Sequence, residues 1–289
     1  MRARATIASM TVMVTGVEHA LGRAVVGGLL RRGGEVRSFL DPAAGPAGTV
    51  DTLRQAGVKT ARGSLADEAL LETAVTGAHT VVHAAADPMA DPTDVLEDVA
   101  SVLSAALSAQ ARRLVVVSHL GCDQARGNAW LDALGEAEAL LAEAPLPTVV
   151  IRRALTYGLD DALTHAVAEG APGADPDALH APLWIEDLAA AAVAADADDV
   201  AAIGHLVVSL GGPRTASLSE LIALLGGQIP ASPDTATMPD GSRLPAHVVD
   251  LLSRDLLPGR DAPAAGTSIE AGGERVRQEA DAAMGGEGG

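Results

Sequence analysis

The chain has 289 residues and a formal net charge of −18, with 48% hydrophobic residues but only 1% aromatic residues. A surface this acidic repels phosphate backbones and anionic lipid, so nucleic acid and membranes are not expected as partners. The single cysteine, Cys122, permits no internal disulfide and fits a reducing compartment, so we expect a cytoplasmic protein.

Short β-branched runs alternate with helix-length segments rich in Ala and Leu, after a flexible lead-in over residues 1–10. The predicted strands cover residues 11–14, 35–40, 58–61, 80–83, 114–117 and 148–151, and helices are predicted over 20–32, 67–75 and 128–143. This alternation is typical of a parallel sheet covered on both faces by helices. It predicts an α/β fold with a doubly wound, mostly parallel Rossmann sheet, whose dinucleotide-binding core spans residues 11–155.

The alternation weakens after residue 155, where three prolines fall within residues 170–182. Further helices are predicted over 186–195, 217–225 and 246–256, and a strand over 205–209. We expect residues 156–270 to supply the remaining core elements and a small C-terminal substrate lobe. Residues 271–289 consist mainly of Gly, Glu and Ala with little to bury, which predicts a disordered tail.

The segment Thr15–Gly22, with the sequence TGVEHALG, joins the first predicted strand to the first predicted helix. Gly16 would allow a tight turn there, and Gly22 would allow the helix to pack closely on the strand. The helix N-terminus would then face a pyrophosphate with its amides and its positive dipole. The sequence therefore predicts a dinucleotide site that includes Thr15, Gly16, Ala20, Leu21 and Gly22, with an ordinary strand-to-helix turn as the alternative.

Several further motifs follow this loop in a specific order. They are Gly33-Gly34-Glu35-Val36-Arg37, Val81–Ala86, Arg113–Ser118, Gly135-Glu136-Ala137-Glu138, Thr148–Gly158 and Trp184–Ala189. With them, residues 11 to about 225 resemble the extended and atypical short-chain dehydrogenase/reductase superfamily, and more narrowly its NmrA-like and epimerase-like branch. The resemblance implies that the cofactor is NAD or NADP.

The same resemblance suggests further residues at the cofactor. His19 stands where the family has its third glycine, and it can either hydrogen-bond a phosphate or narrow the site. Asp41 follows the second strand and favours NAD by accepting from ribose hydroxyls, although it can equally be a turn residue before Pro42. Ser64 and Leu65 match a family Asp-hydrophobic pair that flanks the adenine, with the acid absent here, and Ala84 and Ala85 of the Val81–Ala86 motif are also expected to bind the cofactor.

The catalytic positions depart from the family pattern. The family uses a Ser or Thr after the fifth strand and a Tyr-x-x-x-Lys on the next helix, where residues four apart share a face. Here Trp130 matches the tyrosine, Leu134 matches the lysine, and His119 follows Ser118 in place of a second serine. His119 could act as a general acid or base, or it could be a hydrogen-bonded loop residue. Trp130 could form a wall of a substrate pocket or only pack the helix.

Three functions remain open on this evidence. The first is an NAD(P)-dependent enzyme that acts on a small metabolite without the usual Ser-Tyr-Lys triad, using His119, Ser118 and Trp130. The second is a non-catalytic, NmrA-like dinucleotide sensor, and the third is a structural remnant without a cofactor. The spacing of His, Cys and acidic residues indicates no metal site. The expected partner is a small-molecule substrate, and the sequence leaves a homodimer open.

Overall fold

The computed structural model describes residues 10–124, 127–196, 204–229, 237–238, 241–259, 262–264 and 266–285, the last seven by their backbone only. The lead-in residues 1–9 and the final residues 286–289 lie outside the described part. Within that part, no helix is both long enough and apolar enough to cross a membrane.

A parallel sheet of seven strands forms the centre of the molecule. Its strands are β1 (Thr11–Thr15), β2 (Glu35–Leu40), β3 (Lys59–Arg62), β4 (Thr80–His83), β5 (Arg113–His119), β6 (Thr148–Arg153) and β10 (His205–Leu210). They lie in the order β10-β6-β5-β4-β1-β2-β3, and every neighbouring pair is parallel. The predicted fold class, a doubly wound Rossmann sheet, is confirmed.

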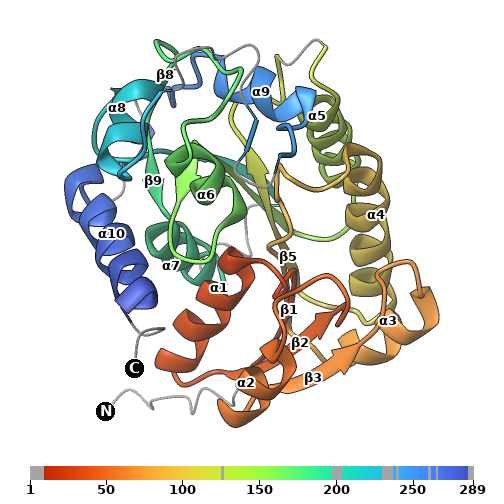
Figure 1. Cartoon of the computed structure of the whole chain (residues 1–289). Helices are drawn as coiled ribbons and strands as arrows, with labels where there is room; N and C mark the ends of the chain where they lie inside the picture. The colour runs from red at the N-terminus through yellow and green to blue at the C-terminus, as the bar shows by residue number, and fades with distance from the viewer. Residues whose placement is uncertain are drawn as a thin grey trace, which may run out of the picture.

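Helices cover both faces of this sheet (Figure 1). On one face lie α1 (Ala20–Arg31) and α7 (Ile185–Ala194), and on the other lie α3 (Glu68–Val75), α4 (Pro92–Ser108) and α5 (Ala129–Ala142); the short α2 (Thr49–Gln55) leads into β3. Side chains alternate along each strand, so β5 sends Val115 and Val117 into one core cluster and Leu114 and Val116 into the other. Burial on both faces explains the continuous apolar runs of the strand sequences.

A smaller lobe stands beyond the carboxyl ends of the strands. Its elements are β7 (Thr156–Tyr157), α6 (Ala162–Ala168), β8 (Leu179–His180), β9 (Leu183–Trp184), β11 (Ala216–Ser217), α8 (Leu218–Leu224) and α9 (Ala246–Leu252). They share a third hydrophobic cluster, in which Tyr157 and Trp184 meet edge to face at 5.4 Å between ring centroids. The predicted substrate lobe thus has a core of its own.

The predicted disordered tail is wrong for residues 271–285, which belong to the helix α10 (Ile269–Gly285). Ile269 is only 1% exposed and packs in the third cluster. The following glycines allow a close approach: a Cβ on Gly272 would collide with the Tyr157 hydroxyl, and one on Gly273 would lie 2.9 Å from the Leu224 carbonyl oxygen. The composition misled the prediction because small residues, rather than large apolar ones, make this contact.

Candidate functional site

The strand order reverses direction between β1 and β4. The chain leaves β1 toward β2 on one side, while β4 lies on the other side, so the loops diverge and leave a crevice at the carboxyl edge. At this edge Thr15 Oγ1 lies 2.8 Å from His83 Nδ1, which ties the ends of the two strands together. Burial lowers the pKa of His83 to about 4, so its ring is neutral near pH 7.

The segment Thr15–Gly22, which we call the phosphate loop, packs closely against the backbone at the end of β4. Gly16 has a φ of +84°, and a Cβ there would approach the backbone of Ala84 and Ala85 at 2.7 Å. A Cβ on Gly22 would run into the carbonyl oxygen of Gly16. Both glycines are therefore required by the path of the backbone. The loop predicted from sequence thus has the tight turn and the close packing that were expected of it.

The phosphate loop also presents the start of α1. His19 is the N-cap residue and its side chain makes no capping bond, while the amide of Arg23 donates to the His19 carbonyl at 3.3 Å. The amides from Ala20 to Gly22 precede that bond, so the helix itself supplies them with no partner. A helix N-terminus of this kind attracts an anion through its amides and its dipole.

Two cavities meet at the phosphate loop. The first cavity, of about 220 Å³, is bounded by Ala20, Leu21, Ala84, Asp87, Arg153 and Asp161 among others, and the second, of about 380 Å³, is bounded by Asp41, Ser64, Leu65, His83, Ala85 and Asp98 among others. Glu18, His19, Ala44 and Ala86 line both cavities. The structure thus brings the predicted cofactor residues together around one elongated groove, with Thr15 buried beneath it.

His19 forms an ion pair across this groove. Its Nδ1 lies 3.1 Å from Asp87 Oδ2, and the two side chains are 27% and 18% exposed. Burial lowers the pKa of His19, but the hydrogen bond and charge of Asp87 outweigh it and leave the pKa above its usual value. The pKa of Asp87 is raised by burial and lowered more strongly by His19, so it lies below its usual value. The two directions agree, because each charged side chain stabilises the charged form of the other.

Asp41 is the turn residue that one of its two predictions described, and it also lies at the second cavity. It follows β2 at the second cavity, and its Oδ1 accepts the amide of Ala43 at 2.8 Å in a turn. The other carboxylate oxygen is not used by that turn bond, so the turn does not prevent the side chain from meeting a ligand hydroxyl.

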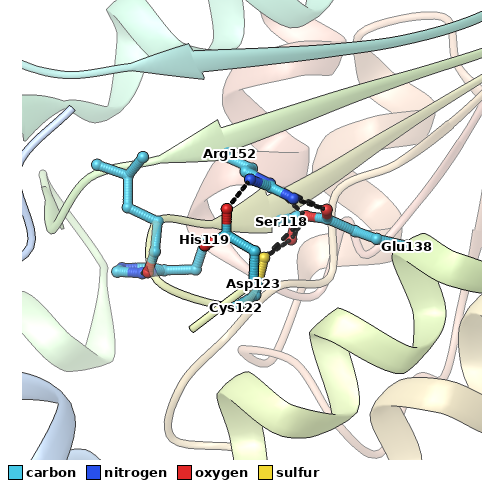
Figure 2. A network of polar contacts seen from close by, with 7 residues as sticks. Ser118, His119, Cys122, Asp123, Glu138 and Arg152 are labelled. Carbon is cyan, nitrogen blue, oxygen red and sulfur yellow. Dashed lines mark hydrogen bonds and ion pairs between the residues drawn. The ribbon is translucent and has the colours of Figure 1, made fainter. Parts of the chain in front are cut away.

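Ser118 belongs to a polar network on the α5 side of the sheet (Figure 2). Its hydroxyl donates to Glu138 at 2.6 Å, and the Cys122 thiol donates to the same oxygen at 3.0 Å. Arg152 joins Glu138 and Asp123 at 2.7 and 2.6 Å. Burial raises the pKa of Cys122 to about 12, which keeps the thiol protonated. Ser118 is thus held by an ion-pair network and lines neither of the two cavities.

His119 points away from that network (Figure 2), and its ring contacts Trp130. Both side chains are 0% exposed, and their rings meet edge to face at 5.4 Å. His119 Nδ1 donates to the Leu120 carbonyl at 2.8 Å, and burial, helped by Arg153, lowers its pKa to about 3. The expectation that His119 acts as an acid or base near neutral pH is therefore corrected: the ring stays neutral and reaches neither cavity. The alternative for Trp130, packing of the helix, matches its position.

Sequence reasoning missed two polar residues of the first cavity. Asp87 lies just beyond β4, and Asp161 accepts the amide and hydroxyl of Thr164 at 2.8 and 2.7 Å. Between them lies the buried Arg153, which donates to Thr156 Oγ1 at 2.9 Å and to the Ala86 carbonyl at 2.6 Å. The position of Asp87 after a buried strand was the available signal. Among the described side chains, no group of three or more His, Cys, Asp or Glu could hold a metal ion.

Comparison with known proteins agrees with this geometry. A family model described as NAD(P)H-binding matches residues 16–195, whereas no curated protein matches the sequence. The UDP-glucose 4-epimerase of Thermotoga maritima is 16% identical with a TM-score of 0.73, over 95% of this chain and all of that one. The Bordetella bronchiseptica enzyme WbmG, solved with NAD, is 18% identical with a TM-score of 0.70, over 97% and 96% of the two chains. A Bifidobacterium longum UDP-glucose 4-epimerase, solved with NAD⁺ and UDP, is 18% identical with a TM-score of 0.67, over 93% and 98%.

Proposed function

The chain belongs to the NAD(P)H-binding family, and from this premise we propose that it is a short-chain dehydrogenase/reductase-like enzyme that acts on a small metabolite without a Ser-Tyr-Lys triad. The observation that carries the proposal is the groove in which the phosphate loop, the start of α1 and the end of β2 meet. It lies at the switch point of the sheet, where open α/β folds bind their ligands.

The residues present fit a dinucleotide. Gly16 and Gly22 let the phosphate loop pack closely on the backbone after β4 and on the start of α1, where a pyrophosphate would be held by the amides of Ala20 to Gly22. Asp41 would accept from a ribose hydroxyl, and Ser64 and Leu65 would flank the adenine. When bound, the cofactor supplies a hydride acceptor or donor, while the protein supplies binding and orientation.

We assign proton transfer to the first cavity instead of the triad positions. Ser118 donates its hydroxyl to Glu138, and His119 and Trp130 are sealed in the core. The first cavity holds Asp161, whose pKa is raised by burial, and Thr156 beside Arg153. A carboxyl group with a raised pKa is a candidate acid or base, and a buried guanidinium favours an anionic or carbonyl oxygen nearby.

Binding is tested first, by calorimetry with NAD, NADH, NADP and NADPH. We expect binding of at least one dinucleotide, with NAD favoured, and absence of binding by all four would overturn the proposal. Hydride transfer is then followed by the absorbance of the reduced nicotinamide, with nucleoside diphosphate sugars first in the panel because the similar structures include enzymes of UDP-sugars.

Two variants then locate the chemistry. Asp161→Asn should lower turnover about a hundredfold or more, as expected when a general acid or base is lost. His119→Gln should change turnover little once corrected for folded protein. The reverse result would return the catalytic role to His119, and tight binding without turnover on any substrate would favour the sensor. A homodimer stays a prediction, which sedimentation of the purified chain tests.

A further inference from the structure

The groove that would hold the dinucleotide is lined by many more acidic than basic side chains. Glu18 borders both cavities, Asp87 and Asp161 border the first, and Asp41 and Asp98 border the second. A pyrophosphate carries negative charge, so each of these carboxylates opposes its binding. Burial and the neighbouring acids already raise the pKa of Asp98 to about 6, which shows how unfavourable a further negative charge is here.

Two cationic side chains line the groove, and they differ in what they can offer. Arg153 is buried and directs its two terminal nitrogens to Thr156 and to the Ala86 carbonyl. His19 is partly exposed, lines both cavities, and uses only Nδ1, in its pair with Asp87. Among the described residues nothing bonds to Nε2 of His19. Arg153 keeps an Nε that has no partner among the described residues, but its side chain is buried and lines only the first cavity, so His19 is the more accessible of the two cations.

His19 belongs to the anion-binding part of the loop. The residue is the N-cap of α1, so it directly precedes the amides of Ala20 to Gly22, and it lines the first cavity together with Ala20 and Leu21. Asp87 restrains the ring from the opposite wall of the first cavity. We propose that His19, restrained by Asp87, is the phosphate-binding side chain of this loop, so that affinity for the dinucleotide pyrophosphate depends on the protonation of a single imidazole. This inference rests on the proposed dinucleotide site.

The chemistry of the ring gives the sign of the pH dependence. The imidazolium donates from both nitrogens, so Nε2–H can bind a phosphate oxygen while Nδ1–H stays with Asp87. The neutral ring that keeps Nδ1–H on Asp87 turns a lone pair on Nε2 toward the phosphate, which repels it. Affinity is therefore full below the pKa of His19 and falls above it, by up to about tenfold per pH unit.

The effect of His19 on the pH dependence must be distinguished from the effects of the other charged groups near its ring. These groups come from the phosphate loop, α1, β4 and its loop, and α4. They are Glu18, Arg23, His83, Asp87 and Asp98. His83 is neutral and Arg23 is charged throughout the neutral range, so neither titrates there. Glu18 and Asp98 have raised pKa values and lose charge on acidification, which also favours an anion. An Asp98→Asn variant removes the largest of these contributions.

The experiment measures the affinity for NAD and for inorganic pyrophosphate by calorimetry from pH 5.5 to 8.5, a range of about one to two units on either side of an ordinary histidine pKa. The variants are His19→Gly, Asp87→Asn and Asp98→Asn. His19→Gly restores the residue that related loops carry, and glycine is a tolerated N-cap, so we expect a folded protein. In parallel, the Cε1 proton of His19 is titrated by NMR with and without pyrophosphate.

For the native chain we expect affinity to fall on alkalisation and the pKa of His19 to rise when pyrophosphate binds. His19→Gly should flatten the profile, and Asp87→Asn should move its midpoint to lower pH. Asp98→Asn should raise affinity and, because its charge interacts with that of His19, should move the midpoint in the same direction but less far than Asp87→Asn. A profile that His19→Gly leaves unchanged, with NAD bound, overturns the inference but not the proposed function. If pyrophosphate shifts the pKa of His19 but no dinucleotide binds, the proposed function is overturned and the anion site remains. If neither ligand binds, the proposed function and this inference are both overturned.

Discussion

The carboxyl ends of β1 and β4 open onto a groove, whereas the end of β5 in the same sheet is closed. At the open end, His19 and Asp87 stay 27% and 18% exposed and lie 3.1 Å apart. At the closed end, Ser118, His119 and Trp130 are at most 1% exposed. All these strands point the same way, so a place at the carboxyl edge does not by itself give access to a ligand. Access depends on what the next element packs over the strand end.

Different side chains bring about the two outcomes. After β1 the chain turns through Gly16 and Gly22, which let the loop pack closely on its neighbours, and the residues between them line the two cavities. After β5 it enters a turn that leads to α5, whose first residues, Trp130 and Leu131, are both fully buried. The large indole thus covers the strand end where a smaller or polar residue would leave room. The difference between the two ends can be tested one residue at a time.

The largest effect is expected at the closed end. Trp130→Ala removes a fully buried indole, and we expect a loss of about 3–5 kcal/mol in the free energy of unfolding, measured with urea. Trp130→Phe is the control: it keeps most of the volume and removes an indole N–H that has no partner among the described residues, so it should cost far less. If Trp130→Ala leaves stability unchanged, the end of β5 is not closed.

At the open end, Gly22→Ala should abolish dinucleotide binding, because its Cβ collides with the Gly16 carbonyl and displaces the loop. Losing two hydrogen bonds to a charged group, at about 1.5–3 kcal/mol each, predicts at least about a hundredfold weaker binding. The matched control is Gly27→Ala in the same helix, where a Cβ meets only the flexible end of Arg31 at 3.4 Å. It should bind normally. Equal affinities in the two variants would place the cofactor elsewhere.

The closed end also predicts a pH dependence of stability. The pKa of His119 is about 3 in the folded chain and about 6.5 when unfolded, so only the unfolded state takes up a proton between these values. Stability should be unaffected by this group above pH 6.5, and it should fall on acidification below that by up to about 1.4 kcal/mol per pH unit. His83, with a pKa of about 4, acts in the same direction. His119→Gln should reduce this slope, and an unaltered slope would mean that the ring is solvated.

The smallest effect is expected at Asp41. If it accepts from a ribose hydroxyl, NAD should bind more tightly than NADP, and Asp41→Ala should narrow that preference by about tenfold at most, the value of one hydrogen bond. The amide bond to Ala43 is lost as well, so a melting curve serves as the control for a local change in the turn. A native chain that prefers NADP would show that the second cavity accepts the extra phosphate despite Asp41.

The strands and the glycine loop could be predicted from the sequence, because both depend on local sequence patterns. Helix α4 was missed, although Asp91 before Pro92 is a start signal and its side chain does cap Thr93 at 3.0 Å. The burial of His119 was not readable, because it depends on Trp130 and on Arg153, which approach from distant parts of the chain. The partner of His19 was equally remote, since Asp87 lies on the loop after another strand.

The two tryptophans are the only indoles of the chain, and each lies in a different hydrophobic cluster. Trp130 is in the cluster of the central sheet, while Trp184 is in the lobe, beside Tyr157 and with the Arg275 guanidinium 5.5 Å from its ring centre. Phenylalanine at one site at a time would give two proteins, each with a single indole, whose emission under excitation that Tyr157 does not absorb monitors one half of the molecule. Coincident emission changes during denaturation would mean that sheet and lobe melt as one cooperative unit, and separate changes would give the lobe a stability of its own.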